Sequence, residues 1–484
     1  MGENFKPMPT EQPEFVPETK VEKERNSEGL SKETVKKEAL DVKWYSRFRE
    51  AGAFSDIEFF EGNPDNRSQQ KADFLEGKID NPKFDYPDAK PEVLQQKEDS
   101  LLRLKEEIID QEPNEVVRQA YRWKINEKVA ELRMLQATAS GDMRRFKRYA
   151  DFIYGKPSQD VFSYVVDLAR SDTDRFMSSA DPQEKKAAED VQAILPQNLE
   201  RAVAFTPPEQ SDVDTLREFT EKKMGNLIAL TGGGEEELNR EQIGQAFEEA
   251  FKVVGADNWQ VVIDTGSRVT MAVNQAQEKV FIPTKIPISK PAKDMAKLLI
   301  HEIGTHVARR IKGERSKLML LGLGLDRFIA GEEGVTGAME QAMDNYVDPF
   351  DVDMKYILGI GLAQGLDGRK RDFRGVFEVL KKQWTMREMA QGKKLPEAEK
   401  AAEQTAYNTC TRIFRGTDCK TPGACYPKDM GYREGTLNTW EVIRTNPDEM
   451  QRFCVGKYDP HNARHLWVLD QLEINDEDLT KLEK

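Results

Sequence analysis

The spacing of the apolar residues changes near Gly255, and this change restricts the fold more than any other feature of the sequence. Across residues 91–254, apolar side chains recur at helical spacing among many charged residues. After Gly255, β-branched and aromatic residues gather in short runs at residues 259–263, 268–273 and 279–282. These runs predict three strands of a small sheet, arranged as a meander. We therefore predict an α+β fold in which a mostly helical region precedes a small β-sheet.

Punctuating residues divide the helical region into separate helices. Pro113 separates two long charged segments that run over residues 91–112 and 116–139, and we expect them to pair as a helical hairpin. A coiled coil that binds a partner is the alternative interpretation. The further helices expected are Met143–Tyr154, Gln159–Arg170, Pro182–Ala193, Asp212–Leu230 and Arg240–Val254. After the strands, Ser289 as N-cap and Pro291 in the first turn predict the start of one more helix.

Composition predicts three regions along the 484 residues. Residues 1–43 are rich in Pro, Glu, Lys and Ser and hold few large apolar side chains, so we expect a disordered charged tail. Residues 44–254 are expected to form the mostly helical N-terminal region, and residues 255–484 a second domain. A chain of this length can bury a core large enough for both.

Charge and cysteine content restrict partners and location. The formal net charge of −14 argues against a nucleic-acid partner, because phosphate contacts need clustered Lys and Arg. No segment approaches the roughly 18–20 apolar residues that cross a bilayer, and no apolar core of a signal peptide is present near the start. We interpret Cys410, Cys419, Cys425 and Cys454 as reduced thiols of a soluble, cytoplasmic protein. A disulfide between Cys419 and Cys425 and a structural zinc site are the alternatives.

A short segment after the predicted strands contains two of the four histidines. It reads His301-Glu302-Ile303-Gly304-Thr305-His306 and follows an apolar run. Two imidazoles are suitable ligands for zinc, and an adjoining carboxylate can accept a proton from a water beside the metal. We therefore predict a Zn²⁺ site with His301 and His306 as ligands and Glu302 as general base. The alternative is a buried helix whose histidines bind backbone carbonyl groups.

The spacing of these histidines makes a structural demand. Residues four apart share one face of a helix, whereas residues five apart lie about 140° from each other on an ideal α-helix. A π-type widening between His301 and His306 would restore a shared face, and such widenings are frequent at functional sites. Gly304, between the two histidines, would let the backbone deform at low steric cost.

A zinc site that performs chemistry needs a third protein ligand. Glu332 and Glu333 lie in an otherwise apolar stretch about thirty residues further on, at the start of a predicted helix. We predict that Glu333 binds the metal and that Glu332 holds a histidine in place. The reverse assignment, with Glu332 as the ligand, remains open.

These motifs resemble those of the microtubule-associated tyrosine carboxypeptidase (MATCAP) family. The resemblance rests on the histidine motif, on Glu332-Glu333-Gly334, and on two later stretches, Ile413-Phe414-Arg415-Gly416 and Pro427–Gly435. It implies a zincin-like metallopeptidase domain over residues 255–484 and a bacterial member of the family. The implied activity is that of a zinc metallocarboxypeptidase, which removes a tyrosine- or glutamate-type residue from the C-terminus of a protein or peptide.

A carboxypeptidase must bind a free carboxylate and stabilise an oxyanion. Arg and Lys are natural partners of a carboxylate, and we expect Lys428 and Arg415, then Arg433, to bind the substrate. The phenol of Tyr432 is the expected oxyanion donor. Two other functions remain open: a zinc endopeptidase with the same metal ligands, and a non-enzymatic helical partner-binding protein with a structural metal.

Overall fold

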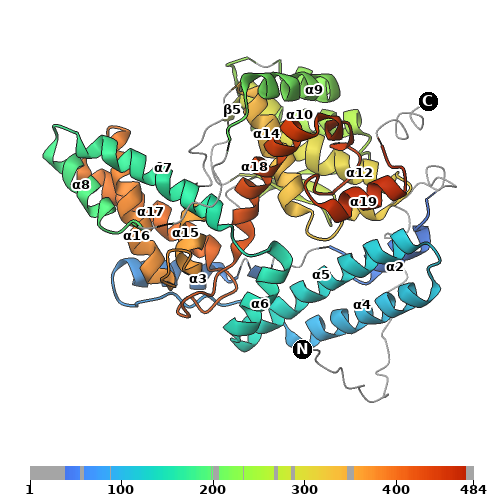
Figure 1. Ribbon diagram of the computed structural model, residues 1–484, viewed down its shortest axis with the longest axis horizontal. Coiled ribbons are helices and arrows are strands. Elements are labelled where there is room, and N and C mark those ends of the chain that lie inside the picture. The colour runs from blue at the N-terminus through green and yellow to red at the C-terminus, as the bar shows by residue number, and fades with distance from the viewer. Residues whose placement is uncertain are drawn as a thin grey trace. The chain divides into compact units, whose positions relative to one another are not determined.

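The computed structural model describes residues 39–54, 59–60, 62–87, 89–197, 199, 206–232, 234–265, 271–284, 289–345 and 354–475. The chain divides into two units, Met1–Glu38 and Ala39–Lys484, and every described residue lies in the second. Most of the predicted tail therefore lies outside the described residues. Helices dominate the described part, and two small sheets accompany them, which confirms a mostly helical α+β protein (Figure 1). No helix in these ranges is both long enough and apolar enough to cross a bilayer.

The first group of helices contains the predicted hairpin. Its elements are α2 (Val42–Glu50), α3 (Pro64–Leu75), α4 (Pro91–Gln111), α5 (Glu115–Ser140) and α6 (Met143–Tyr154). Pro113 lies between α4 and α5, and Asn114 caps α5 through hydrogen bonds from the backbone N–H groups of Val116 and Val117. The two helices pack against each other, which confirms the hairpin (Figure 1).

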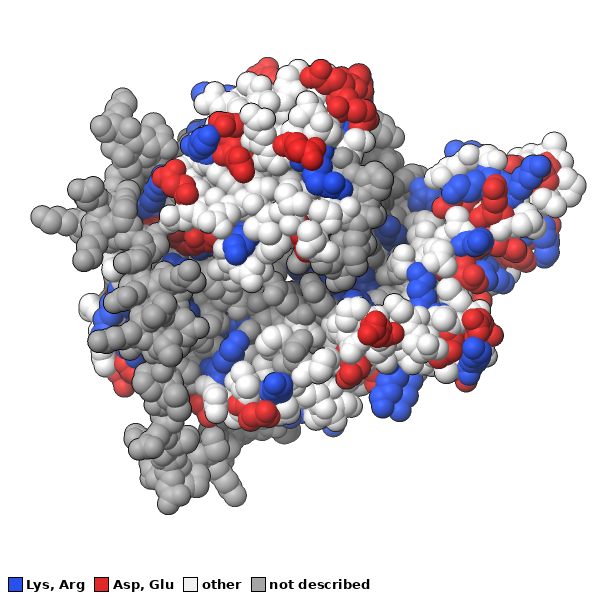
Figure 2. Space-filling model, turned by 180° about the vertical axis from the view of Figure 1, so that it is seen from behind, with Lys and Arg blue, Asp and Glu red and all other residues white. Residues whose placement is uncertain are grey.

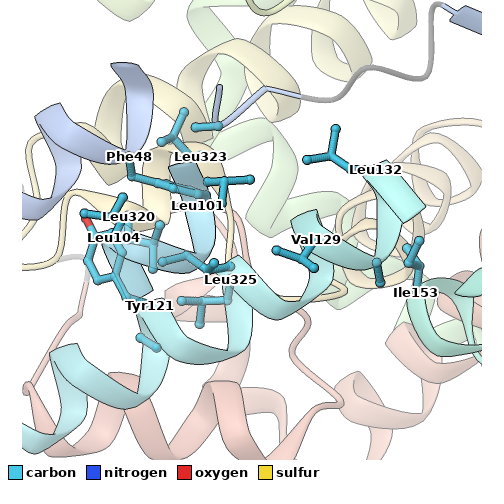
Figure 3. Close-up of a cluster of buried hydrophobic side chains, with 14 of the residues drawn as sticks. Phe48, Leu101, Leu104, Tyr121, Val129, Leu132, Ile153, Leu320, Leu323 and Leu325 are labelled. Carbon is cyan, nitrogen blue, oxygen red and sulfur yellow. The ribbon is translucent and has the colours of Figure 1, made fainter. Parts of the chain in front are cut away.

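The hairpin shares a hydrophobic core with residues much later in the chain. Leu101 and Leu104 of α4 and Tyr121 of α5 meet Leu320, Leu323 and Leu325, around the short helix α13 (Leu320–Leu323), as Figure 3 shows. Asp41 adds a polar connection, since its carboxylate accepts hydrogen bonds from Tyr121 Oη (2.8 Å) and from the Met319 and Leu320 backbone N–H groups. The apolar face of the hairpin is thus covered within the fold.

A second group of helices encloses its own core. It comprises α7 (Gln159–Met177), α8 (Pro182–Gln192), α15 (Met354–Gln364), α16 (Phe373–Ala390) and α17 (Leu395–Ile413). Phe74 of α3 joins this core edge-on against Phe373 and Phe377, with ring centroids 5.1 and 4.9 Å away. All four cysteines are buried free thiols, so the alternative of a Cys419–Cys425 disulfide is wrong.

The third group holds the histidine motif. Its helices are α9 (Gln210–Ala229), α10 (Arg240–Val254), α11 (Ala292–Leu299), the π-helix η2 (Ile300–Val307), α12 (Ala308–Glu314), α14 (Ile329–Met343) and α18 (Met430–Thr445). The short helices η3 (Pro427–Asp429) and η4 (Pro447–Arg452) flank α18, and α19 (Ala463–Gln471) is the last. Apolar side chains of α9, α10, α11, η2, α14 and α18 form one core.

The predicted strands at residues 259–263 and 279–282 are confirmed, and the predicted strand at 268–273 is confirmed at its end, since residues 268–270 lie outside the described residues. The meander is wrong. The strands are β2 (Gln260–Asp264), β3 (Ala272–Asn274) and β4 (Lys279–Pro283), in the order β2-β4-β3. β4 pairs in parallel with β2 and antiparallel with β3. β4 occupies the centre because Val280 and Ile282, both fully buried, face the helical core. A meander pairs consecutive strands antiparallel, so the parallel pairing of β2 with β4 is incompatible with it.

The expected helix start at Ser289 is also wrong. Residues Ser289–Pro291 form β5, which pairs antiparallel with β1 (Glu237–Asn239). The helix α11 begins after this pair, at Ala292. Backbone pairing with a distant strand therefore takes precedence over the local capping signal.

Candidate metal centre

The two histidines lie on a π-helix, as their spacing predicted. η2 covers Ile300–Val307, and Thr305 Oγ1 donates a hydrogen bond to the Ile300 carbonyl oxygen, five residues back, at 3.1 Å. The wider turn brings the imidazoles of His301 and His306 together, with ring centroids 5.1 Å apart and planes at 70°. The predicted deformation of the helix is thus confirmed, and both rings lie on one side of it.

Gly304 has a structural reason that differs from the expected one. It is not among the glycines with positive φ, so its backbone is of a kind that other residues adopt. A Cβ atom at this position would lie 2.7 Å from Met224 Sδ and 3.1 Å from Leu227 Cδ1, both on α9. Side chains of α9 therefore occupy the space beside Gly304, and a larger residue there would require them to shift.

Glu333 presents its carboxylate to both histidines. Its Oε2 atom lies 4.0 Å from His301 Nε2 and 3.9 Å from His306 Nε2. These separations are too long for hydrogen bonds. They are a few tenths of an ångström longer than the roughly 3.3–3.6 Å between ligand atoms of a tetrahedral zinc ion, so small side-chain shifts would bring the three atoms to ligand distance. Glu333 belongs to α14, whose first turns face the π-helix.

Glu332 makes a different set of contacts. Its Oε1 atom lies 3.3 Å from His306 Nδ1 and 3.2 Å from Lys457 Nζ. Burial alone would raise the pKa of Glu332, but the positive charge of Lys457 and the contact with His306 hold this pKa well below its usual range. The Glu332 carboxylate is therefore a buried anion that lies beside the Nδ1 atom of His306.

Glu340 holds the other histidine and was missed by sequence reasoning. Its Oε1 atom lies 3.0 Å from His301 Nδ1. Although burial alone would lower the pKa of His301, this hydrogen bond and the charges of Glu302, Glu340 and Glu333 raise it to about 9. The signal was available, since a residue seven positions after Glu333 on one helix lies on nearly the same face.

Two carboxylates compete for the place of third ligand. His301, Glu302 and His306 can bring one potential ligand atom each within 4.8 Å of one another. We favour Glu333, because its oxygen is nearly equidistant from the two Nε2 atoms at 4 Å or less. This arrangement leaves Glu302, which adjoins His301 in sequence, free to handle a proton.

Close packing of two helices fixes Glu333 relative to the later segment of the chain. A Cβ atom on Gly334 would lie 2.3 Å from the carbonyl carbon of Gly435, and one on Gly435 would lie 1.8 Å from the Ala330 carbonyl oxygen. Only glycines allow α14 and α18 to come this close. The helix of the metal-side carboxylates therefore lies directly against the helix that carries Tyr432.

The candidate substrate residues Lys428 and Tyr432 lie near Glu333. Burial lowers the pKa of the Lys428 amine, and the charge of Glu333 opposes that shift. Burial, followed by the negative charges of Glu333 and Asp429, raises the pKa of the Tyr432 phenol well above its ordinary value. Tyr432 thus keeps its proton and can donate a hydrogen bond.

Arg415 has an incompletely used guanidinium group beside these residues. Arg412 donates two hydrogen bonds to the Asp429 carboxylate, at 2.8 and 2.7 Å. Arg415 lies 4.0 Å from the same carboxylate. The Arg415 group stacks over Tyr426 at 4.7 Å, and its Nε atom is buried with no hydrogen-bond partner. Arg433, in contrast, is buried at 4% exposure within α18, and its role in substrate binding stays a prediction.

Two imidazoles and a carboxylate, held by further carboxylates from behind, form the kind of donor set that a divalent transition metal takes up.

The family model described as microtubule-associated tyrosine carboxypeptidase matches residues 393–477. The match confirms the resemblance to this family over that segment, which includes Arg415, Lys428 and Tyr432. Comparisons with curated proteins and with solved structures find no match.

Proposed function

We propose that the protein is a zinc-dependent carboxypeptidase that removes the C-terminal residue of a protein or peptide. The observation that carries the proposal is the position of Glu333 Oε2, 4.0 and 3.9 Å from the Nε2 atoms of the two π-helical histidines. The name of the matching family supports carboxypeptidase activity. The small sheet before the histidine helix is compatible with a zincin-like fold, and the buried free thiols suit a cytoplasmic protein.

The donor set fits zinc. His301 and His306 would bind it through Nε2, because Glu340 and Glu332 occupy the two Nδ1 atoms. Glu333 would be the third ligand, which leaves a fourth position open, as catalytic zinc sites require. A bound zinc ion would supply Lewis acidity that activates a water and polarises the scissile carbonyl group.

Glu302 is the proposed general base. Its carboxylate can lie within 4.8 Å of a ring nitrogen of each histidine, and with Glu333 as the third ligand it would be left for proton transfer. It would accept the proton of the attacking water and pass it to the nitrogen of the leaving residue. A single carboxylate would thus transfer the proton from the attacking water to the leaving nitrogen.

Tyr432, Lys428 and Arg415 would handle the substrate. The protonated phenol of Tyr432 would donate a hydrogen bond to the oxyanion that forms at the scissile carbonyl. Lys428 and the incompletely paired guanidinium of Arg415 would bind the terminal carboxylate, which an internal peptide bond lacks. Binding of the terminal carboxylate would restrict cleavage to the end of a chain, and we expect a tyrosine- or glutamate-type residue there.

The test uses the full chain and two peptides that differ only in a free or an amidated C-terminus. We expect stoichiometric zinc by elemental analysis, loss of one residue from the free peptide by mass spectrometry, and no cleavage of the amidated one. Glu302→Gln should keep zinc and lose activity by about 10²-fold or more. Equal cleavage of both peptides would show an endopeptidase with the same ligands. Zinc-loaded protein that cleaves neither peptide would contradict the proposal.

A further inference from the structure

Arg415 is a half-buried cation whose guanidinium group has few polar contacts. Its side chain is 24% exposed, its Nε atom is buried with no hydrogen-bond partner, and the Asp429 carboxylate lies 4.0 Å away. On the face in Figure 2, by contrast, acidic and basic side chains are interspersed, so many of the cations there have acidic neighbours. An arginine with so few polar contacts can bind an added carboxylate tightly if another group sets its orientation.

The ring of Tyr426 is suited to set that orientation. The guanidinium carbon of Arg415 lies 4.7 Å from the ring centroid, within the range of a cation–π contact. The ring is fully buried and meets Phe60 and Tyr154 edge-on, with ring centroids 5.6 and 5.1 Å away. The Tyr426 hydroxyl lies 2.7 Å from the Tyr154 hydroxyl. This hydrogen bond holds the outer end of the ring on which Arg415 stacks.

Both phenols keep their protons. Burial, followed by the neighbouring Tyr426 and Glu131, raises the pKa of the Tyr154 phenol well above its ordinary value. Burial also raises the pKa of the Tyr426 phenol, although the charge of Arg415 opposes this shift. Two neutral hydroxyls thus share one hydrogen bond, and replacing either tyrosine by phenylalanine leaves the other hydroxyl without that partner. The pair is therefore sensitive to the loss of a single oxygen atom.

The backbone beside Arg415 is held by the N-terminal helical region. Gly416 has a positive φ of +76°, and a Cβ atom there would lie 2.5 Å from Phe60 Cε1, so the chain passes close to this ring. The Gly416 N–H donates to Tyr86 Oη at 2.8 Å, and its carbonyl oxygen accepts from Thr138 Oγ1 at 2.7 Å. The main chain next to Arg415 is therefore fixed, and its side chain remains to be oriented.

Tyr154 is itself held by the helical hairpin. It is the last residue of α6, and the preceding Ile153 belongs to the same hydrophobic core as Val129 and Leu132 of α5, as Figure 3 shows. α5 and α6 pack directly against each other. α6 lies before the segment that the family model matches, so the match does not imply a role for Tyr154. A residue of the N-terminal region thus supports a side chain of the matched segment.

We propose that Tyr154 is a positioning residue for substrate recognition, which fixes the Tyr426 ring and, through it, the guanidinium group of Arg415. The inference rests on the proposed function, in which Arg415 binds the terminal carboxylate of the substrate. A guanidinium group that is already oriented loses less freedom when it binds a carboxylate, so it binds more tightly. Loss of the Tyr154 hydroxyl should therefore weaken binding of a free C-terminus and leave the chemical step unaffected.

The binding test uses Glu302→Gln protein and the two peptides with a free and an amidated C-terminus. Fluorescence anisotropy should show that Tyr154→Phe weakens binding of the free peptide about fivefold, the effect of one neutral hydrogen bond, and leaves the amidated peptide unchanged. Tyr149→Phe removes a hydroxyl from the same helix, one that interacts with Arg133, and should change neither. Unchanged binding of the free peptide, or an equal loss for both peptides, would overturn the proposal.

A double-mutant cycle shows whether Tyr154 acts through Arg415. Arg415→Gln should itself weaken binding of the free peptide, and Tyr154→Phe should add nothing in that background. Tyr426→Phe should resemble Tyr154→Phe, and the double phenylalanine variant should lose no more than either single variant. In the active protein, Tyr154→Phe should raise KM for the free peptide about fivefold with kcat unchanged. The same loss in the Arg415→Gln background, or a lowered kcat, would contradict a positioning role.

A chemical measurement separates this proposal from the proposed function. Phenylglyoxal modifies guanidinium groups, and mass spectrometry gives its rate at Arg415. The rate should rise severalfold in Tyr154→Phe and stay unchanged in Tyr149→Phe. If it does, but zinc-loaded wild-type protein cleaves neither peptide, the positioning contact stands and the proposed function fails. If the free peptide is cleaved, but Tyr154→Phe changes neither KM nor the reactivity of Arg415, the proposed function stands and the proposal about Tyr154 fails.

Discussion

Glu332 and Glu333 are adjacent on α14, and changing each to glutamine should affect protein stability and zinc affinity differently. Glu332 is 5% exposed and pairs with the equally buried Lys457 at 3.2 Å. Glu332→Gln removes the negative charge but leaves the ammonium group of Lys457 buried, which should cost about 3 kcal/mol of stability in the metal-free protein. Glu333 makes no contact shorter than 3.9 Å with the histidines, so Glu333→Gln should cost no more than about 1 kcal/mol.

Zinc affinity should follow the opposite order. Glu332 only orients His306, and losing such a contact typically weakens metal binding by about 10–100-fold. Glu333→Gln removes a proposed ligand and should weaken zinc binding by more than about 100-fold. Urea unfolding in the presence of a chelator gives the stabilities, and competition with a chromophoric chelator gives the affinities. If Glu332→Gln loses more zinc affinity than Glu333→Gln, the two roles are reversed and our reasoning about the site is wrong.

Three further expectations follow from contacts around the same centre. Glu340→Gln should weaken zinc binding by about tenfold, because His301 Nδ1 loses its charged partner; an unchanged affinity measured by chelator competition would remove Glu340 from the site. In metal-free protein the pKa of His301 is raised from 6.5 to about 9, so its stabilising effect is complete below about pH 6.5 and is lost as the pH rises through 9. The free energy of unfolding in urea, taken as wild type minus His301→Gln, should fall by no more than about 3 kcal/mol over that pH range. A difference that does not change with pH would contradict the raised pKa of His301. Gly334→Ala should destabilise the protein by about 3 kcal/mol or more in thermal or urea unfolding, whereas Gly431→Ala, whose Cβ would meet nothing closer than 3.6 Å, should be nearly neutral.

Local signals in the sequence predicted the local structure well. The predicted bounds of α6 and α10 agree with the observed ones, because each helix has a capping residue at its start and a glycine directly after its end. The spacing of His301 and His306 predicted the π-helix, because only a widened turn places both rings on one side.

Features that depend on distant residues were not predictable in this way. The order of the strands and the β1–β5 pair depend on which backbone edges meet in three dimensions. The role of Lys457 as partner of Glu332, and of α9 as the neighbour of Gly304, required contacts between segments far apart in the chain. Periodicity along the sequence contains no information about such contacts.

The proposed function depends on two parts of the chain that are supported by different observations. The metal-side residues, from His301 to Glu340, lie before the matched segment, and their case rests on the sequence motifs and on geometry. The substrate-side residues, from Arg415 to Tyr432, lie within the matched segment, and their case rests mainly on the family. The close approach of Gly334 and Gly435 joins the two parts, because it sets α14 against α18 with no side chain between them. Geometry and family resemblance therefore support the proposed function from the two sides of this helix crossing.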